Sequence, residues 1–123
     1  MIKAVWIELP VKDLERAMKF YQAVFDLQLT DILDEEVRRT TTLFPGSGEG
    51  AAGISLNQAK NFEPGVKGPF VYLDAGEELT PCLNRVEPAG GKIIEAKTSM
   101  GAAGYYAAIH DTEGNLIALY SPK

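Results

Sequence analysis

Residues 4–26 read AVWIELPVKDLERAMKFYQAVFD, and this stretch decides the fold. Its apolar residues first alternate at Val5, Ile7 and Leu9, a pattern typical of a β-strand with one buried face. From Leu14 onward the apolar spacing changes to three or four residues, as in an amphipathic helix. Asp13 stands directly before that helix, where an N-cap belongs. We therefore predict a strand, a capped turn and a helix in one run.

The length and composition are those of a single globular domain. The sequence has 123 residues, of which 46% are hydrophobic and 24% charged. A chain of this length buries roughly two-thirds of the surface that it exposes when unfolded. No apolar run approaches the ~20 residues of a membrane span, and the N-terminus opens into the first strand rather than into a secretory signal. We therefore expect no membrane partner and a cytoplasmic location.

Charge and cysteine content narrow the classes of partner. The 12 basic and 17 acidic residues give a net charge of −5, which argues against nucleic acid or an anionic membrane surface. The single cysteine, Cys82, excludes an internal disulfide and a multi-cysteine zinc site. Its place on the inner stripe of a predicted helix favours a buried structural thiol. A small molecule or a protein is the expected partner.

The rest of the first half predicts further strands and a linker. Beta-prone runs are separated by a polar turn and by a loop rich in glycine. The predicted strands cover residues 27–33, 37–44 and 51–57. With the opening strand and helix they make residues 1–57 a βαβββ module. A polar segment that contains Pro64 and two glycines predicts a linker over residues 58–68.

The pattern restarts after this linker. Residues 70–75 repeat the alternation of residues 6–11, and a second amphipathic helix with Pro81 in its first turn follows over 77–90. The strands predicted beyond it cover residues 92–98, 105–110 and 115–120. Residues 69–123 therefore form a second βαβββ module. Neither module buries both faces of its sheet alone, so the two share one α+β domain.

Several motifs support this organisation independently. They are the run from Glu8 to Tyr21, the Ala89–Gly91 turn and the closing stretch Asp111–Tyr120. Together they resemble the vicinal oxygen chelate superfamily, which includes glyoxalase I, bleomycin resistance proteins and extradiol dioxygenases. The resemblance covers nearly the whole chain and implies that the modules form a half-open barrel around a central cavity, usually in a homodimer. Whether the modules that share a cavity belong to one chain or to two is left open.

The resemblance also identifies the positions of a metal site. In the superfamily's metalloenzymes one divalent ion is held by residues from the first and last strands of each module. On this chain those positions fall on Trp6, Ser55, Phe70 and Ala118. None of these side chains is an imidazole or a carboxylate, the ligands that such an ion needs. We therefore expect neither a metal ion nor another cofactor.

A cavity lined in this way suits a small apolar or aromatic molecule. The predicted ligand-binding residues are Trp6, Glu8, Ser55, Phe70, Tyr72, Asp74, Ala118 and Tyr120. The opposite strand faces, expected to pack on the helices, carry Val5, Ile7, Leu9, Val71 and Leu73. We predict metal-independent binding of a ligand without chemistry, as the resemblance to bleomycin resistance proteins implies.

Two other functions stay open at this point. The chain could be a lyase, isomerase or dioxygenase that holds a metal ion through displaced ligands such as Glu8, Asp74 or His110. Alternatively, Trp6 and Phe70 fill the cavity and leave a dimeric scaffold.

Some single residues also allow two interpretations. Glu8 is a candidate general base if burial raises its pKa, and otherwise a partly solvated carboxylate. His110 is the only histidine and a candidate acid or base, but its place beside a tight turn favours a surface role. One of Tyr105 and Tyr106 must face the cavity, and alternation does not tell which. The loop over residues 99–104 is either a lid or an idle hairpin.

Overall fold

The computed structural model describes residues 1–29 and 31–123 and shows two βαβββ modules in the predicted order. The first consists of β1 (Trp6–Pro10), α1 (Leu14–Phe25), β2 (Leu33–Asp34), β3 (Arg38–Phe44) and β4 (Gly53–Ala59). The second consists of β5 (Val71–Asp74), α2 (Thr80–Val86), β6 (Lys92–Ser99), the 3-10 helix η1 (Gly101–Ala103), β7 (Tyr105–His110) and β8 (Leu116–Ser121). The predicted α+β class is confirmed.

Each module forms an open four-stranded sheet with the same strand order. The orders are β1-β4-β3-β2 and β5-β8-β7-β6, so β1 and β5 are edge strands. In each sheet the first strand runs parallel to the last, and the register places Glu8 opposite Ser55 and Tyr72 opposite Ala118. Glu8 and Tyr72 therefore hold equivalent positions in the two modules, as do Ser55 and Ala118, in agreement with the repeat identified in the sequence.

Helix α1 begins where its sequence predicts. Asp13 accepts a hydrogen bond from the Arg16 N–H at 3.1 Å, which satisfies one of the donors that a first helical turn leaves without a partner. At the other end Asp26 is left-handed, and its N–H donates to the carbonyl of Gln22. The helix buries Leu14, Ala17, Met18, Phe20, Tyr21 and Val24. This apolar face forms one side of the core.

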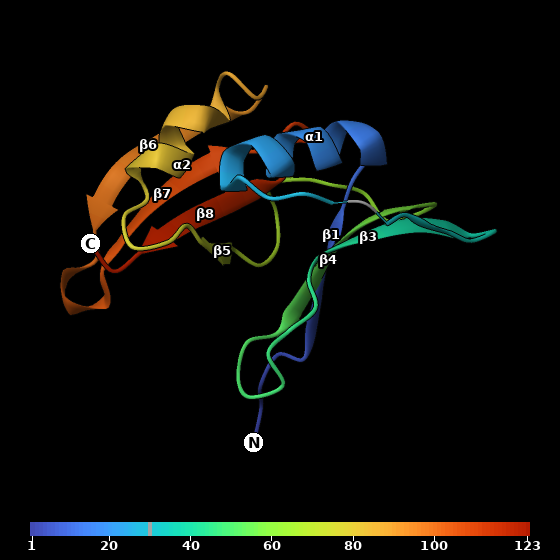
Figure 1. Ribbon diagram of the computed structural model, residues 1–123, viewed down its shortest axis with the longest axis horizontal. Coiled ribbons are helices and arrows are strands. Elements are labelled where there is room, and N and C mark those ends of the chain that lie inside the picture. Colours follow the sequence, from blue (N-terminus) through green and yellow to red (C-terminus); the bar gives the residue numbers. More distant parts are fainter. Residues whose placement is uncertain (30) are drawn as a thin grey trace.

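The two helices lie in one layer and share a single hydrophobic core. Figure 1 shows α1 and α2 side by side over the β5–β8 sheet, whereas β1 and β4 descend from this layer toward the N-terminus. The core joins Leu9 of the first module to Ile109 and Ile117 of the second. Between the helices, Arg85 Nε donates to the Val24 carbonyl at 2.9 Å. Neither helix in the described part of the chain has the length and apolar character that a bilayer span requires.

The turn between β7 and β8 fastens the second module to the start of α1. The buried Glu113 carboxylate accepts hydrogen bonds from the N–H groups of Lys12 and Asp13 at 2.8 and 2.9 Å and pairs with Arg16 at 2.8 Å. Burial alone would raise the pKa of this carboxyl. The Arg16 guanidinium, with the donors of Asp13, Thr112 and Lys12, outweighs burial and holds the pKa below its usual value.

Replacing Glu113 by glutamine is expected to destabilise the protein chiefly at neutral pH. Because the pKa is depressed in the folded state, the carboxylate stabilises the fold above the ordinary glutamate pKa of about 4.3. That contribution is lost as the pH falls through the folded pKa. Urea unfolding of wild type and E113Q should therefore show a difference in unfolding free energy that narrows from about pH 5 to about pH 2. A difference that stays constant over this range would show that the charge of the Glu113 carboxylate does not stabilise the contact between the β7–β8 turn and α1.

Two predictions about the first sheet are wrong. The strand predicted over residues 27–33 is reduced to its end in β2, and the Gln22 side chain accepts the Leu29 N–H at 2.8 Å, which ties part of this segment to α1 instead. Residue 30, within that range, lies outside the described residues. Val5 was expected to pack on a helix but is 74% exposed, since β1 begins only after it.

Two other boundaries move by a few residues. Helix α2 starts at Thr80 rather than at the predicted residue 77, because the Glu78 carboxylate accepts the Thr80 N–H in a turn that precedes the helix. It ends at Val86, before the predicted residue 90. Strand β4 extends through Gln58 and Ala59, the first residues of the predicted linker. Gln58 then accepts the Leu14 N–H at 2.9 Å, which ties β4 to α1.

Candidate functional site

One face of the first sheet carries Trp6, Glu8, Ser55, Arg38 and Asn57, and we call it the Trp6 face. The Trp6 indole Nε1 donates a hydrogen bond to Ser55 Oγ at 3.0 Å, and Asn57 Nδ2 donates to the same oxygen at 2.9 Å. A hydroxyl oxygen accepts at two lone pairs, so these donors use the acceptor capacity of Ser55. Trp6 and Ser55, the two metal-ligand positions that the resemblance assigns to the first module, are therefore hydrogen-bonded to each other.

The Trp6 ring lies against the backbone of β4 at Gly53. A Cβ atom added there would stand 2.3 Å from the nearest ring carbon, so the indole occupies the space that any larger residue needs. Trp6 keeps 45% of its surface exposed, whereas Ser55 beneath it is fully buried. Trp6 thus forms an aromatic wall that both covers Ser55 and presents a surface for stacking.

Arg38 covers the other end of the Trp6 face. Its Nη2 donates to Glu8 Oε2 at 2.5 Å and to Asn57 Oδ1 at 2.8 Å, and Thr40 Oγ1 also donates to Asn57 at 2.9 Å. The buried Nε of Arg38 has no hydrogen-bond partner among the described residues. Glu8 is therefore an ion-paired carboxylate at the edge of the face, and the arrangement gives no support to its role as a free general base.

The equivalent face of the second sheet is strongly aromatic. It carries Phe70, Tyr72, Asp74, Tyr106, Ala118 and Tyr120, and we call it the Tyr72 face. The Phe70 and Tyr72 ring centroids are 5.0 Å apart, and these residues are 37% and 48% exposed. Ala118 is fully buried and offers only a methyl group. The second pair of metal-ligand positions, Phe70 and Ala118, thus contains no donor either.

The structure decides between the two adjacent tyrosines. Tyr106 pairs with Tyr120 across the β7–β8 ladder and lies on the Tyr72 face, where its hydroxyl donates to Glu95. This hydrogen bond raises the pKa of Tyr106. Tyr105 points to the opposite face and packs against the core, with Lys97 Nζ 4.6 Å from its ring centroid. Tyr106 therefore joins the candidate site.

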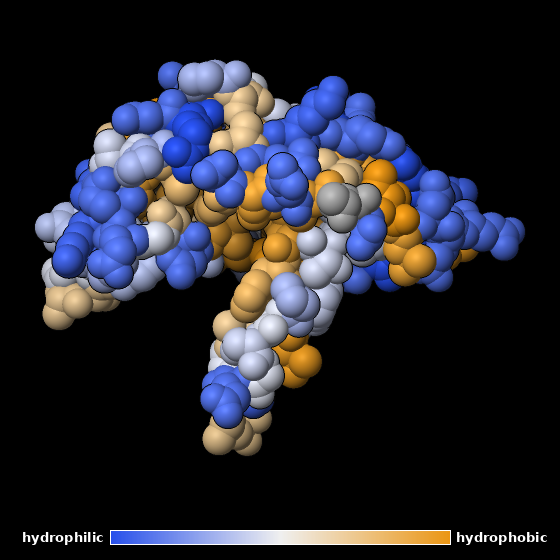
Figure 2. Space-filling model, viewed as in Figure 1, coloured by the Kyte–Doolittle hydropathy of each residue, from blue (hydrophilic) through white to orange (hydrophobic). Residues whose placement is uncertain are grey.

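Within one chain the Trp6 face and the Tyr72 face are turned apart. The other side of the first sheet, with Ile7 and Ile54, faces β5 and lines an apolar cavity of about 510 Å³ together with Leu73. Because successive strand residues point to opposite faces, Trp6 and Ser55 point away from this cavity. Figure 2 shows the hydrophobic hollow at this inner angle of the molecule. Of the predicted ligand-binding residues, Tyr72 and Asp74 border this cavity, whereas Trp6 and Ser55 lie on the other side of the first sheet, so the predicted set does not line one cavity within the chain.

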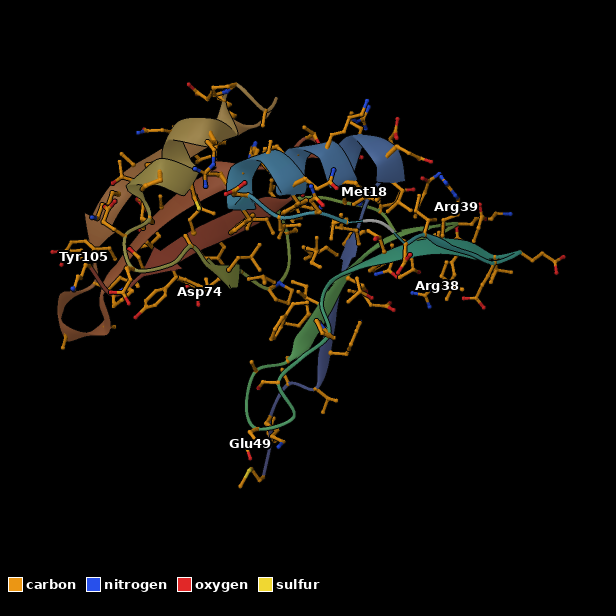
Figure 3. All side chains as sticks on the ribbon, viewed as in Figure 1. Met18, Arg38, Arg39, Glu49, Asp74 and Tyr105 are labelled. Atoms are coloured by element: carbon orange, nitrogen blue, oxygen red, sulfur yellow. The ribbon has the colours of Figure 1, made fainter. Side chains whose placement is uncertain are left out.

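The candidate catalytic residues do not converge. Asp74 lies below β5, whereas Arg38, the partner of Glu8, lies on β3 in another part of the molecule (Figure 3). His110 ends β7 opposite Lys92. In the part of the chain that the structure describes, no three His, Cys, Asp or Glu side chains come close enough to hold a metal ion. No observation favours a displaced metal site.

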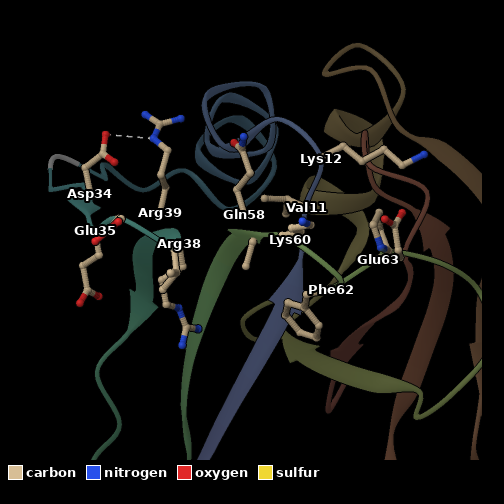
Figure 4. A pocket seen from close by; sticks show the side chains of 14 residues that line it. Val11, Lys12, Asp34, Glu35, Arg38, Arg39, Gln58, Lys60, Phe62 and Glu63 are labelled. Carbon is tan, nitrogen blue, oxygen red and sulfur yellow. Dashed lines mark hydrogen bonds and ion pairs between the residues drawn. The ribbon is translucent and has the colours of Figure 1, made fainter.

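A second cavity, of about 540 Å³, lies at the hairpin end of the first sheet and is mostly polar (Figure 4). Arg39 in its wall is held by Asp34 at 3.2 Å and by Glu15 at 2.6 Å. None of the predicted ligand-binding residues lines it. Its charged lining does not suit an apolar ligand.

The remaining candidate residues have structural partners. The Tyr120 hydroxyl donates to the Ala103 carbonyl at 2.6 Å, which ties the loop over residues 99–104 to the end of β8. Cys82 is buried and its Sγ contacts the Ala75 carbonyl at 3.7 Å, so the predicted structural thiol is confirmed. Burial raises the pKa of this thiol, which disfavours the reactive thiolate.

Three residues of the two faces were not identified from the sequence, Arg38, Asn57 and Glu95, whereas Tyr106 was one of two alternatives. Asn57 follows Ser55 by two positions on one strand, so alternation carries a usable signal for it. Glu95 carries no such signal, because the ladder shifts register between Ile93 and Glu95 and breaks the alternation along β6.

Comparison with known families agrees with this architecture. The model of the Glyoxalase/Bleomycin resistance protein/Dioxygenase superfamily matches residues 3–119, nearly the whole chain. No curated protein matches the sequence.

Solved structures show the same fold at low sequence identity. A hypothetical protein, SA1046, from S. aureus is 23% identical with a TM-score of 0.66, and the match covers 98% of this chain and 94% of that one. A glyoxalase/bleomycin resistance protein/dioxygenase family enzyme from Burkholderia phytofirmans PsJN is 18% identical with a TM-score of 0.71, over 99% and 100% of the two chains. Glyoxalase I from Zea mays is 20% identical with a TM-score of 0.72, but the match spans 95% of this chain and only 45% of that longer one.

Proposed function

Since the chain belongs to the Glyoxalase/Bleomycin resistance protein/Dioxygenase superfamily, we propose that it binds a small, largely apolar or aromatic molecule without a metal ion. The observation that carries the proposal is the pair of hydrogen bonds that Trp6 Nε1 and Asn57 Nδ2 donate to Ser55 Oγ. These hydrogen bonds occupy Ser55 Oγ, the oxygen that a metal ion at this position would need as a ligand. The residues at the superfamily's ligand positions do not fit an ion, and three of the four are apolar or aromatic.

The exposed rings define the chemistry of the ligand. Trp6, Phe70 and Tyr72 each leave more than a third of their surface open to solvent. Stacking on such rings buries apolar area, and the ring quadrupole adds a preference for offset and edge-to-face geometry. Glu8 and Asp74 lie on the same faces and are placed to orient a polar group of the ligand.

We further propose that two subunits of a homodimer complete each cavity. Within one chain Tyr72 and Asp74 border the cavity at the inner side of the first sheet, whereas Trp6 lies on the outer side of that sheet, and the edge strands β1 and β5 each pair on one side only. Exposed Val5 and Phe70 beside these edges are apolar surface that a partner would cover. Placing β1 of one subunit beside β5 of its partner brings a Trp6 face against a Tyr72 face. A two-fold axis then produces two equal cavities.

Mixing two single variants tests both parts of this proposal. Trp6→Ala damages one half-site and Tyr72→Ala damages the other, so each variant homodimer has two damaged cavities. A heterodimer of the two has one intact cavity and one that carries both changes. Each variant alone should bind a neutral aromatic probe such as 2-naphthol at least about tenfold more weakly than wild type. After joint unfolding and refolding, about a quarter of all cavities should regain wild-type affinity.

The control is a mixture of Trp6→Ala with Trp6→Leu, in which both cavities of the heterodimer stay damaged. Recovery in the first mixture and none in the control supports a cavity shared between subunits. No recovery in either mixture contradicts the shared cavity. A wild-type protein that binds no aromatic probe contradicts the binding function itself and favours a scaffold with a filled interior.

A further inference from the structure

The Tyr72 face contains a compact group of rings that the proposed function uses only for stacking. Phe70, Tyr72 and Tyr106, which we call the aromatic triad, have centroid separations of 5.0, 6.2 and 6.5 Å. Their planes are inclined to one another by 55° to 90°. Tyr72 and Tyr106 approach because Ala118, on the strand between them, fills little space. The triad therefore forms a compact cluster of mutually inclined rings on one face of the sheet.

Carboxylates adjoin the triad. Glu95 of β6 accepts the hydrogen bond of the Tyr106 hydroxyl. Asp74 follows Tyr72 by two residues on β5, so it lies on the same face, and it is exposed. One Asp74 oxygen accepts the Gly76 N–H at 2.9 Å, which holds the carboxylate in a turn at the end of β5.

The basic groups of this sheet lie elsewhere. Lys97 is on the opposite face, where it contacts Tyr105 and pairs with Glu78. Lys92 shares the face of Tyr106 by register, but it pairs with His110 at the far end of the β6–β7 ladder, four residues along β7 from Tyr106. The region around the aromatic triad thus combines electron-rich ring faces with an excess of negative charge, in a chain whose net charge is already −5.

This combination discriminates between ligands of different charge. A ring face attracts a cation through its quadrupole and repels an anion, and the attraction grows when the site excludes water. A neighbouring carboxylate favours a cation further and disfavours an anion. Neutral aromatic molecules gain only the stacking and the burial of apolar area.

We propose that the aromatic triad, with Glu95 and Asp74, selects an organic cation, namely a small molecule with an apolar or aromatic body and an amine or quaternary ammonium group. The inference rests on the proposed function, because it assigns a ligand class to that same cavity. The ammonium group lies against the triad between the two carboxylates. The apolar body extends toward the Trp6 face that completes the cavity.

Three probes of similar size test the charge preference: benzyltrimethylammonium, benzyl alcohol and benzoate. Calorimetric titration of the full-length wild-type protein should give a dissociation constant for the cation at least about tenfold lower than for benzyl alcohol. Benzoate should bind more weakly than either. In Glu95→Gln the affinity for the cation should fall about threefold to tenfold, while that for benzyl alcohol changes less than about twofold.

Glu36→Gln is the matched control, because it removes the same charge from an exposed turn of the first sheet. It should leave all three affinities unchanged. Equal binding of the three probes, tightest binding of benzoate, or an unchanged cation affinity in Glu95→Gln would overturn the inference while leaving the proposed binding function in place. Failure of every probe, benzyl alcohol included, would overturn both.

Discussion

Replacing Asp111 by alanine is expected to lower the free energy of unfolding by about 3–5 kcal/mol. The carboxylate is buried in the turn between β7 and β8 and accepts the Tyr21 hydroxyl at 2.6 Å. It also accepts the N–H groups of Glu113 and Asn115, each at 2.9 Å, and Asn115 Nδ2 at 3.0 Å. Alanine leaves these buried donors without an acceptor, and each unsatisfied donor costs about 1–3 kcal/mol.

Urea unfolding followed by circular dichroism measures this loss. Asp111→Asn keeps an acceptor oxygen in place and should lose about half as much as alanine. Glu36→Ala, in an exposed turn, should change the unfolding free energy by less than about 0.5 kcal/mol. If Asp111→Ala stays within about 1 kcal/mol of wild type, the turn does not hold the two modules together as described.

Replacing Trp6 by alanine should weaken the binding of a neutral aromatic probe about tenfold to a hundredfold, the energetic equivalent of about 1.4–2.8 kcal/mol. The indole supplies the stacking wall of the Trp6 face and covers Ser55. The loss of stability should be smaller than for Asp111→Ala, because almost half of the Trp6 surface is already exposed. Trp6 is the only tryptophan, so calorimetry rather than intrinsic fluorescence must follow binding to this variant.

Gly53→Ala provides the complementary change, because it moves the indole without removing it. The added methyl group would stand 2.3 Å from the Trp6 ring, so the ring must swing out toward solvent. Its fluorescence should shift to longer wavelength and the probe affinity should fall. Gly65→Ala is the control, since a Cβ atom there meets no other atom within 4 Å. Unchanged probe affinity in both Trp6→Ala and Gly53→Ala would show that Trp6 is not part of the binding site.

Much of the fold could be predicted because both modules carry the same local patterns. The alternation at the first strand, the N-cap Asp13 and the apolar stripe of α1 are local features that tertiary contacts did not override. The repeat also predicted which positions are equivalent, and the observed register pairs Glu8 with Ser55 and Tyr72 with Ala118.

The assembly of the site could not be predicted in the same way. Alternation identifies the residues that share a strand face, but it does not tell which other element that face meets. The hydrogen bond from Trp6 to Ser55 joins positions on neighbouring strands 49 residues apart. Glu95 joins the aromatic triad only because β6 shifts register. These contacts depend on tertiary geometry that no local pattern encodes.

The most direct test of metal-independent binding is a titration of the wild-type protein with 2-naphthol after removal of divalent ions by EDTA. We expect one dissociation constant, the same within about twofold, in EDTA and in an excess of zinc, nickel or manganese. Loss of binding in EDTA with recovery on addition of one of these ions would contradict it, because a bound ion would then be part of the site.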